Sequence, residues 1–144
     1  MADIRKIDDN WVEEQTARGT WKYRDLSGER LGVRIEVIMP GETSSEHHFH
    51  TAEEEHVIAL EGCATLVLGA DCLELNAGDH VWFKAGEAIA HHIENTSGQP
   101  FRFLVFGERN SNDIVFYPDR EIAMVKALGR EKFTIQPGSS GGAE

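Results

Sequence analysis

The sequence has little cysteine, no long apolar run and far fewer basic than acidic residues. Two cysteines in 144 residues are too few for a scaffold held together by disulfides. Fourteen lysines and arginines against 25 aspartates and glutamates give a formal net charge of −11, which repels phosphate backbones. No segment approaches the roughly 20 apolar residues that a membrane-spanning helix needs. These absences predict a globular protein that has neither a nucleic-acid partner nor a membrane partner.

The N-terminal sequence bears on the cellular compartment, and the compartment bears on the cysteines. Residues 1–15, MADIRKIDDNWVEEQ, lack the apolar segment of a secretory signal, so we expect a cytoplasmic protein with free thiols. Cys63 and Cys72 lie in the segment GCATLVLGADCLEL, which predicts opposite strands of a hairpin. We interpret both as small buried core residues, because free cysteine is usually buried.

Turn signals recur at short intervals through the middle of the chain, among them Pro40-Gly41 and Asn76-Ala77-Gly78-Asp79. The segments between the turns are short and rich in β-branched or aromatic residues: RIEVIM (34–39), HVIAL (56–60), ATLVL (64–68), CLEL (72–75), HVWF (80–83) and FRFLVF (101–106). Short strands at regular intervals favour an all-β fold, either an antiparallel sandwich or a barrel.

The two ends of the chain are less distinctive. The length suits one domain covering residues 1–144. Residues 1–30 could carry a short helix or a strand, and EIAMVKALGREKF (121–133) is compatible with a helix or with a late hairpin. The polar sequence from about residue 136 to residue 144, QPGSSGGAE, predicts a flexible tail.

All seven histidines lie within residues 47–92, which suggests that several are recruited to one place. His48 and His50 share one face of a strand, because successive side chains alternate, so one cation could contact both imidazoles. Glu55 begins the next apolar strand, and a carboxylate there could reach the same cation. His91 lies on a later strand that a closed barrel could bring alongside.

The first group of these residues resembles the first motif of the cupin superfamily. That motif runs Gly, five residues, His-x-His, three or four residues, Glu, six residues, Gly. Here its positions are taken by Gly41, His48, His50, Glu55 and Gly62. The only departure is the spacer between Gly41 and His48, which is one residue longer.

The second group resembles the second cupin motif, which runs Gly, five residues, Pro-x-Gly, two residues, His, three residues, Asn. Here its positions are taken by Gly78, Lys84-Ala85-Gly86, His91 and Asn95. Lys84 replaces the proline, and His91 lies two residues further from Gly86 than the motif expects. The His-to-Asn spacing favours His91 over His92 as a ligand, and the choice between them stays open.

The resemblance implies a small antiparallel β-barrel of the double-stranded β-helix, or jelly-roll, type, with its core at about residues 30–120. It also implies a site of three histidines and one carboxylate, formed by His48, His50, Glu55 and His91. Such a set suits one divalent transition metal per chain (Fe, Mn, Ni, Cu or Zn) and leaves two positions of an octahedral ion open. The small bacterial cupins that this chain resembles have no assigned reaction.

Three further residues are candidates for substrate binding: Arg34, Trp82 and Phe103. Arg34 could anchor a substrate carboxylate if it points inward, but we favour an outward position, because arginine is rarely buried unpaired. Trp82 and Phe103 are first of all core residues, and some of these aromatics must also wall the cavity.

The remaining polar residues of the motif region receive less specific interpretations. We interpret Glu53 and Glu54 as solvent-facing residues or as groups that orient a ligand histidine. Asn95 could close a turn or hold the strand that carries His91, and we favour the turn. The other histidines are assigned to the surface or to packing: His47, His56, His80 and His92.

These features together predict a metal-dependent enzyme that acts on a small polar organic molecule, as an oxygenase or as an isomerase or lyase. The alternative is a non-catalytic barrel that binds or senses a small molecule or a metal. We also expect a homodimer, since cupins commonly associate in this way. Neither the substrate nor the native metal follows from the sequence.

Overall fold

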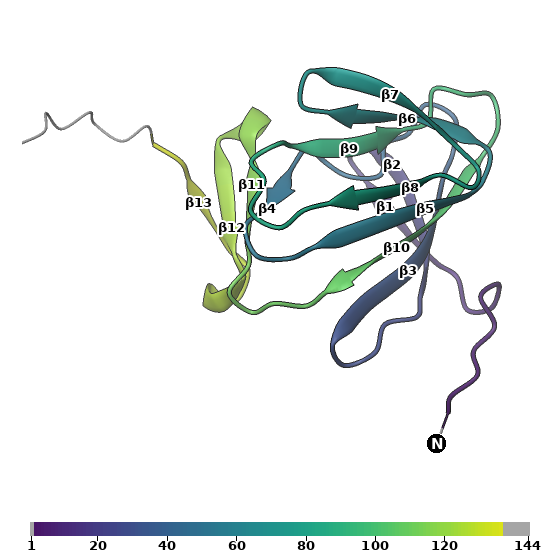
Figure 1. Ribbon diagram of the computed structural model, residues 1–144, viewed down its shortest axis with the longest axis horizontal. Coiled ribbons are helices and arrows are strands. Elements are labelled where there is room, and N and C mark those ends of the chain that lie inside the picture. Colours follow the sequence, from purple (N-terminus) through teal and green to yellow (C-terminus); the bar gives the residue numbers. More distant parts are fainter. Residues whose placement is uncertain (1, 137–144) are drawn as a thin grey trace, which may run out of the picture.

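The computed structural model describes residues 2–136, which form 13 short β-strands and two single turns of 3₁₀ helix (Figure 1). The all-β fold that the sequence predicts is therefore confirmed, and every strand pair within these residues is antiparallel. The tail expected from about residue 136 lies outside the described residues, apart from Gln136. No helix in the described part of the chain is long and apolar enough to cross a membrane.

The largest sheet contains six strands in the order β1-β2-β3-β10-β5-β8. Their bounds are Val12–Thr16 (β1), Gly19–Asp25 (β2), Leu31–Ile38 (β3), Phe101–Glu108 (β10), Glu55–Glu61 (β5) and His80–Phe83 (β8). The hairpin of β1 and β2 shows that the N-terminal region carries strands and not the short helix that was the alternative.

Two smaller sheets complete the fold (Figure 1). One has the order β7-β6-β9, with bounds Asp71–Asn76 (β7), Cys63–Leu68 (β6) and His91–Glu94 (β9). The other has the order β13-β12-β11-β4, with bounds Glu131–Thr134 (β13), Ile122–Val125 (β12), Ile114–Tyr117 (β11) and Phe49–His50 (β4). Of the two interpretations of residues 121–133, the hairpin is therefore correct, with a 3₁₀ turn at Lys126–Leu128 between its strands.

The hydrophobic core lies between the six-stranded and the three-stranded sheet. Phe101 and Phe103 alternate along β10 and are at most 1% exposed, while Leu66 of β6 and Ile93 of β9 come from the other side and are 3% exposed. Alternation along each strand therefore sends one set of side chains into the barrel and the other set outward. This fixes which residues can reach an interior site.

The predicted hairpin position of the two cysteines is confirmed, but their predicted burial is wrong. They lie on opposite strands of the β6–β7 hairpin, as the sequence indicates, but both are exposed. The inward positions of β6 are Ala64 and Leu66, and that of β7 is Leu75. Cys63 and Cys72 are an odd number of residues away from these positions, so the alternation turns them outward.

Asn95 closes the turn that follows β9 and ties it to β3. Its side chain is 1% exposed, and its amide donates to the carbonyls of Ile38 (2.9 Å) and Gln99 (2.7 Å). Its side-chain oxygen accepts from the backbone N–H of Ser97 at 3.0 Å. The residue has the turn role assigned from the sequence and also anchors the strand that carries His91.

Candidate metal centre

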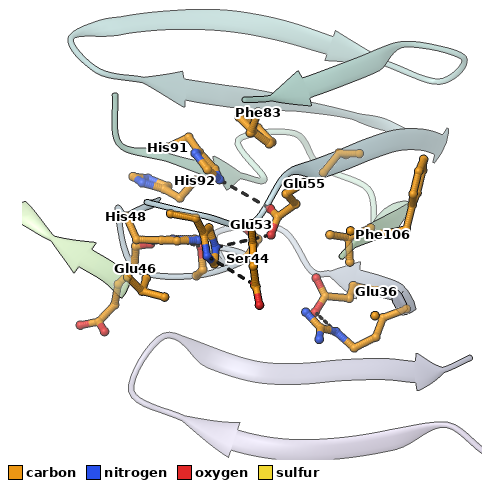
Figure 2. Close-up of a pocket in the computed structure, with 18 of the residues that line it drawn as sticks. Glu36, Ser44, Glu46, His48, Glu53, Glu55, Phe83, His91, His92 and Phe106 are labelled. Carbon is orange, nitrogen blue, oxygen red and sulfur yellow. Dashed lines mark hydrogen bonds and ion pairs between the residues drawn. The ribbon is translucent and has the colours of Figure 1, made fainter. Parts of the chain in front are cut away.

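Four side chains that the sequence singled out line one cavity inside the barrel: His48, His50, Glu55 and His91. Figure 2 labels three of them, His48, Glu55 and His91. Ligand atoms of His48, His50 and Glu55 all lie within 4.8 Å of one another, a group that could hold a metal ion. His91 joins them through its Nε2, which lies 3.5 Å from Oε1 of Glu55. The backbone bridge between His48 and His91 explains the approach of two segments 43 residues apart.

Hydrogen bonds at Nδ1 orient two of the imidazoles. Nδ1 of His48 lies 2.7 Å from the backbone carbonyl of Glu46, and Nδ1 of His50 lies 2.7 Å from Oδ2 of Asp113. A carbonyl or carboxylate oxygen only accepts, so each Nδ1 carries a proton, and in the neutral imidazole the lone pair then lies on Nε2. Nε2 of His50 lies 3.7 Å from Oε2 of Glu55, so this lone pair belongs to the shared site.

Asp113 is the residue of this site that the sequence analysis missed. It is fully buried, and besides His50 its carboxylate accepts from the backbone N–H groups of Ala52 (2.9 Å) and Glu53 (3.1 Å). Burial acts to raise the pKa of Asp113, but these hydrogen bonds hold it below its ordinary value. Asp113 is therefore an ionised, immobilised acceptor that fixes the ring of His50.

Glu53 supports the same histidine from another direction. Its Oε2 lies 3.6 Å from Nδ1 of His50, and its Oε1 forms an ion pair with Lys126. Its side chain is 11% exposed, so of the two roles considered for Glu53 the orienting one fits. Glu54, in contrast, is 44% exposed and pairs with His56 outside the barrel.

The structure also separates His91 from His92. His91 is 4% exposed, its ring stacks on Phe83 at a centroid distance of 3.6 Å, and its buried Nε2 has no hydrogen-bond partner among the described residues. His92 follows on β9, and its Nε2 lies 2.8 Å from Oε1 of Glu94. Of the two histidines, His91 is therefore the one whose Nε2 faces Glu55, at 3.5 Å from its Oε1.

Burial and neighbouring charges set the protonation states of the site. Burial acts to raise the pKa of Glu55, but the imidazoles around it, His91 first, outweigh burial and lower it to about 2. Burial lowers the pKa of His48 to about 4, with His91 acting in the same direction. At neutral pH the carboxylate is ionised and this imidazole is neutral, which are the forms that bind a cation.

The four side chains line a cavity of about 400 Å³, whose walls also include Arg34, Glu36 and Phe103. Phe103 is 1% exposed and lies where the sequence analysis placed it. The outward position favoured for Arg34 is wrong. On β3 the residue pairs with Val105 of β10, which faces inward, and Nε of Arg34 lies 3.4 Å from Oε1 of Glu36. Arginine is rarely buried without a partner, but here Glu36 is a buried partner, so Arg34 can point inward.

Trp82 does not line this cavity, but it lines a neighbouring pocket of about 200 Å³ together with His50 and His91. Its side chain is 51% exposed and stacks on His56 on the outer face of the sheet. Phe83, the next residue of β8, is 8% exposed and faces His91. A single step along a strand exchanges the two faces, so Phe83 takes the position predicted for Trp82.

Glu36 is a second cavity residue that the sequence analysis did not single out. Its side chain is 8% exposed and accepts a hydrogen bond of 2.7 Å from Nε1 of Trp21. Burial raises the pKa of Glu36 above its ordinary value, with Arg34 and then Trp21 opposing the shift. The alternation in RIEVIM puts Arg34 and Glu36 on the same face of the strand. From the sequence we expect the apolar face of this strand to point inward, whereas in the structure the polar face lines the cavity.

Comparison with known proteins agrees with this geometry. A family model described as a cupin domain matches residues 34–107, just over half of the chain. The chain belongs to the cupin family. No curated protein matches its sequence.

Several solved structures resemble this cupin. A candidate sugar phosphate isomerase from Acidithiobacillus ferrooxidans is 32% identical, with a TM-score of 0.69 over 72% of this chain and 69% of that one. A sugar phosphate isomerase of the cupin superfamily from Silicibacter pomeroyi is 28% identical, with a TM-score of 0.69 over 72% and 68% of the two chains. A Cupin 2 conserved barrel domain protein from Salinispora arenicola, 24% identical with a TM-score of 0.60 over 74% and 88%, shares the fold.

Proposed function

We propose that this cupin is a metal-dependent enzyme that acts on a small polar molecule bound in the barrel. The observation that carries the proposal is the buried Nε2 of His91, which has no hydrogen-bond partner in residues 2–136 and faces the ionised Glu55. A buried polar atom without a partner is costly, so such an atom points to a ligand. A cation held by His48, His50, Glu55 and His91 would supply the partner.

The donor set fits one divalent transition metal. Imidazoles and a carboxylate suit Fe, Mn, Ni, Cu or Zn, and four protein ligands leave positions open for substrate oxygens. The acceptors on Nδ1 of His48 and His50 are the outer partners that metal-binding histidines usually have. A bound ion would act as a Lewis acid that polarises an oxygen of the substrate.

Among the reaction classes open to such a site, we favour isomerisation over oxygenation. Support comes from two solved structures, 32% and 28% identical to this chain, whose names describe sugar phosphate isomerases, one as a candidate. Isomerisation of a hydroxycarbonyl compound moves a proton between neighbouring carbons, which requires a group that accepts and returns it. Glu36 is a candidate for this group, because it lines the cavity and its pKa is raised by burial.

Other residues of the chain would prepare the site for this chemistry. Phe83 and Phe103 cover the interior end of the cavity and exclude water there. Arg34 pairs with Glu36 and holds that carboxylate on the wall. Asp113 keeps the ring of His50 in one orientation and one tautomer.

The first test is the metal content of protein purified without chelators or an affinity tag, measured by elemental mass spectrometry. We expect close to one equivalent of Fe, Mn, Ni, Cu or Zn per chain, lost in His50→Ala and kept in His56→Ala, whose side chain lies outside the barrel. Wild-type protein that holds no metal and also refuses added ions would reject the metal-dependent enzyme and favour a metal-free binding barrel.

Turnover is tested separately from metal binding. Metal-loaded protein is incubated with aldoses and ketoses, free and phosphorylated, and their interconversion is followed by NMR. We expect Glu36→Gln to lose turnover while its metal content stays at the wild-type level. Wild-type rates in this variant would remove Glu36 from the reaction. A metal-loaded protein that turns over no compound of the panel would favour the non-catalytic binding or sensor barrel.

Three expectations from the sequence stay predictions: the single domain covering residues 1–144, the homodimer and the cytoplasmic location. The homodimer is tested by light scattering coupled to size-exclusion chromatography. A mass near twice 16.1 kDa is expected, and a monomeric mass at micromolar concentration would reject it.

A further inference from the structure

Two arginines on the cavity wall have no partner, although the chain is strongly acidic. The guanidinium groups of Arg18 and Arg130 form no hydrogen bond or ion pair with any of residues 2–136, and Nε of Arg18 is buried without a partner. The other basic side chains of the wall are all engaged: Arg34 with Glu36, Lys126 with Glu53, and Arg109 with the carbonyl of Gly28. Arg18 is partly buried and Arg130 is exposed, so in a chain with 25 acidic residues both guanidinium groups are free to bind an external anion.

Arg18 and Arg130 come from two turns far apart in the sequence, and both line the cavity. Arg18 lies in the turn between β1 and β2, and Arg130 lies just before β13. Arg130 has a φ of 63°, a left-handed conformation that a side chain of this size rarely adopts, so the turn holds it in an unusual position. Both residues line the same cavity as the four candidate metal ligands.

The hydroxyl of Tyr117 adds a third polar group at this side. It forms no hydrogen bond in the described part of the chain, and the Tyr117 ring lies 5.9 Å from the ring of His48. Burial raises the pKa of Tyr117 and Glu46 adds to the shift, while the guanidinium groups of Arg18, Arg120 and Arg130 oppose it. Tyr117 thus lines the cavity together with Arg18 and Arg130, and its ring borders the candidate metal centre.

The carboxylates nearest to this side are already engaged. Glu46 accepts two hydrogen bonds from Nη1 of Arg120, at 3.0 and 3.2 Å. Asp119 is 74% exposed and lies 3.6 Å from Nδ1 of His47. Neither makes an ion pair with Arg18 or Arg130, so the charge of these two arginines is left uncompensated within the described residues.

We propose that Arg18, Arg130 and the hydroxyl of Tyr117 form a subsite for the phosphate group of a phosphorylated substrate. The proposal rests on the proposed function, because the other end of that substrate would reach the four candidate metal ligands. Two guanidinium groups and a hydroxyl supply more charge and more donors than a carboxylate requires, and they suit the dianion and the three free oxygens of a phosphate monoester.

The test measures binding of inorganic phosphate to metal-free protein by isothermal titration calorimetry at pH 7.5 and constant ionic strength. Metal is left out so that phosphate cannot bind by coordination. We expect saturable binding with one site per chain, weakened about tenfold in Arg18→Gln and again in Arg130→Gln, since each removes charge-assisted hydrogen bonds. Arg120→Gln is the matched control, because it is also near Tyr117 but is paired with Glu46, and its affinity should stay within about twofold of wild type.

Three outcomes would overturn the subsite. They are the absence of saturable phosphate binding in folded wild-type protein, equal losses in Arg120→Gln and in the two subsite variants, and tighter binding of acetate than of phosphate. The last outcome would assign the arginines to a carboxylate. Tyr117→Phe supplies a further measure, with a smaller loss expected because only one neutral hydrogen bond is removed. Circular dichroism of each variant establishes that it is folded.

The failure of this subsite and the failure of the proposed function are distinguishable. Phosphate binding in metal-free protein requires neither a metal nor turnover. Arg18-dependent phosphate binding in a protein that takes up no metal would reject the enzyme but keep the anion subsite. Turnover and one equivalent of metal, without arginine-dependent phosphate binding, would reject the subsite alone.

Discussion

Two histidine clusters lie on opposite sides of β5: the inner one approaches Glu55, and the outer one includes His56, the next residue of the strand. The inner cluster consists of His48, His50 and His91, and the outer cluster consists of His56 and His80 (Figure 2 labels His48 and His91). Each contains imidazoles about 5 Å apart with a carboxylate beside them. By composition and proximity alone, the two would be equal candidates for a metal site.

The hydrogen bonds of the clusters differ. In the outer cluster, Nδ1 of His56 lies 2.9 Å from Nε2 of His80, and its Nε2 lies 2.7 Å from Oε1 of Glu54, so both nitrogens of His56 are engaged. In the inner cluster, only Nδ1 of His48 and of His50 is engaged by a fixed acceptor. Their Nε2 atoms are left to face one shared point.

The difference indicates that a candidate cation site is better recognised by the direction of its free lone pairs than by the number of its histidines. Glu55 and His56 are consecutive residues of β5, and the alternation of the strand sends one to each face. Within the inner group His91 is buried and the side chain of His50 is only 13% exposed, and at such positions an unsatisfied nitrogen is costly and a cation would be worth more than at the surface.

The largest effect is expected from removing one inner histidine. His91→Ala should lower the affinity for the bound divalent ion by more than about 100-fold, since loss of an outer-shell partner alone costs roughly 10- to 100-fold. His80→Ala, in the outer cluster, should leave the affinity within about twofold. Competition with a fluorescent chelator measures both, and His92→Ala serves as a second control. Equal losses of metal affinity in His91→Ala and His80→Ala would show that the inner cluster does not bind the ion more tightly than the outer cluster.

The two aromatic residues of β8 test the same contrast through stability. Phe83 is 8% exposed and stacks on His91, whereas Trp82 is 51% exposed and stacks on His56. Phe83→Ala should lower the free energy of unfolding by about 3 kcal/mol, because it leaves a cavity in the core. Trp82→Ala should lower it by under about 1 kcal/mol. Urea unfolding of metal-free protein measures both, and a larger loss for Trp82→Ala would contradict the assignment of faces.

The carboxylates that hold one histidine in each cluster form a matched pair. Asp113 lies 2.7 Å from Nδ1 of His50, and Glu54 lies 2.7 Å from Nε2 of His56. Asp113→Asn keeps the shape of the side chain but loses the charge, and it should weaken metal binding by about 10- to 100-fold. Glu54→Gln should not change it measurably. An Asp113→Asn variant with wild-type affinity would show that His50 needs no such support.

The alternation of strand residues is the part of this site that could be predicted from the sequence. It placed His48 and His50 on one face and favoured His91 over His92, and the structure brings the three favoured residues to Glu55. These inferences depend only on local geometry. They hold wherever the strand is regular.

Inferences that depend on long-range contacts or on the choice of face could not be made in the same way. Asp113 lies 63 residues from His50 in a turn without a distinctive pattern, so only the folded chain reveals the pair. On β3, the polar residues Arg34 and Glu36 face the cavity. A cavity that binds polar molecules reverses the usual rule that the apolar face points inward, and sequence rules are expected to fail at such positions.

The smallest effect is expected from the buried carboxylate of Glu36, and it concerns pH. Burial raises its pKa above the ordinary value of 4.5. Below pH 4.5 the folded and unfolded states are both protonated. As the pH rises through the raised pKa of the folded state, the unfolded state has already released its proton, so the free energy of unfolding decreases. Glu36→Gln removes this decrease, and urea unfolding of metal-free protein from pH 4 to pH 8 should give a flatter profile than wild type.

The matched control is Glu54→Gln, which removes a carboxylate that is 44% exposed and therefore screened by solvent. Its profile should follow that of wild type more closely than the profile of Glu36→Gln does. A Glu36→Gln profile parallel to wild type across this range would show that the inner carboxylate is solvated as well as the outer one. It would also remove the physical basis for giving Glu36 the proton-transfer role, because that role depends on a carboxyl whose pKa is raised by burial.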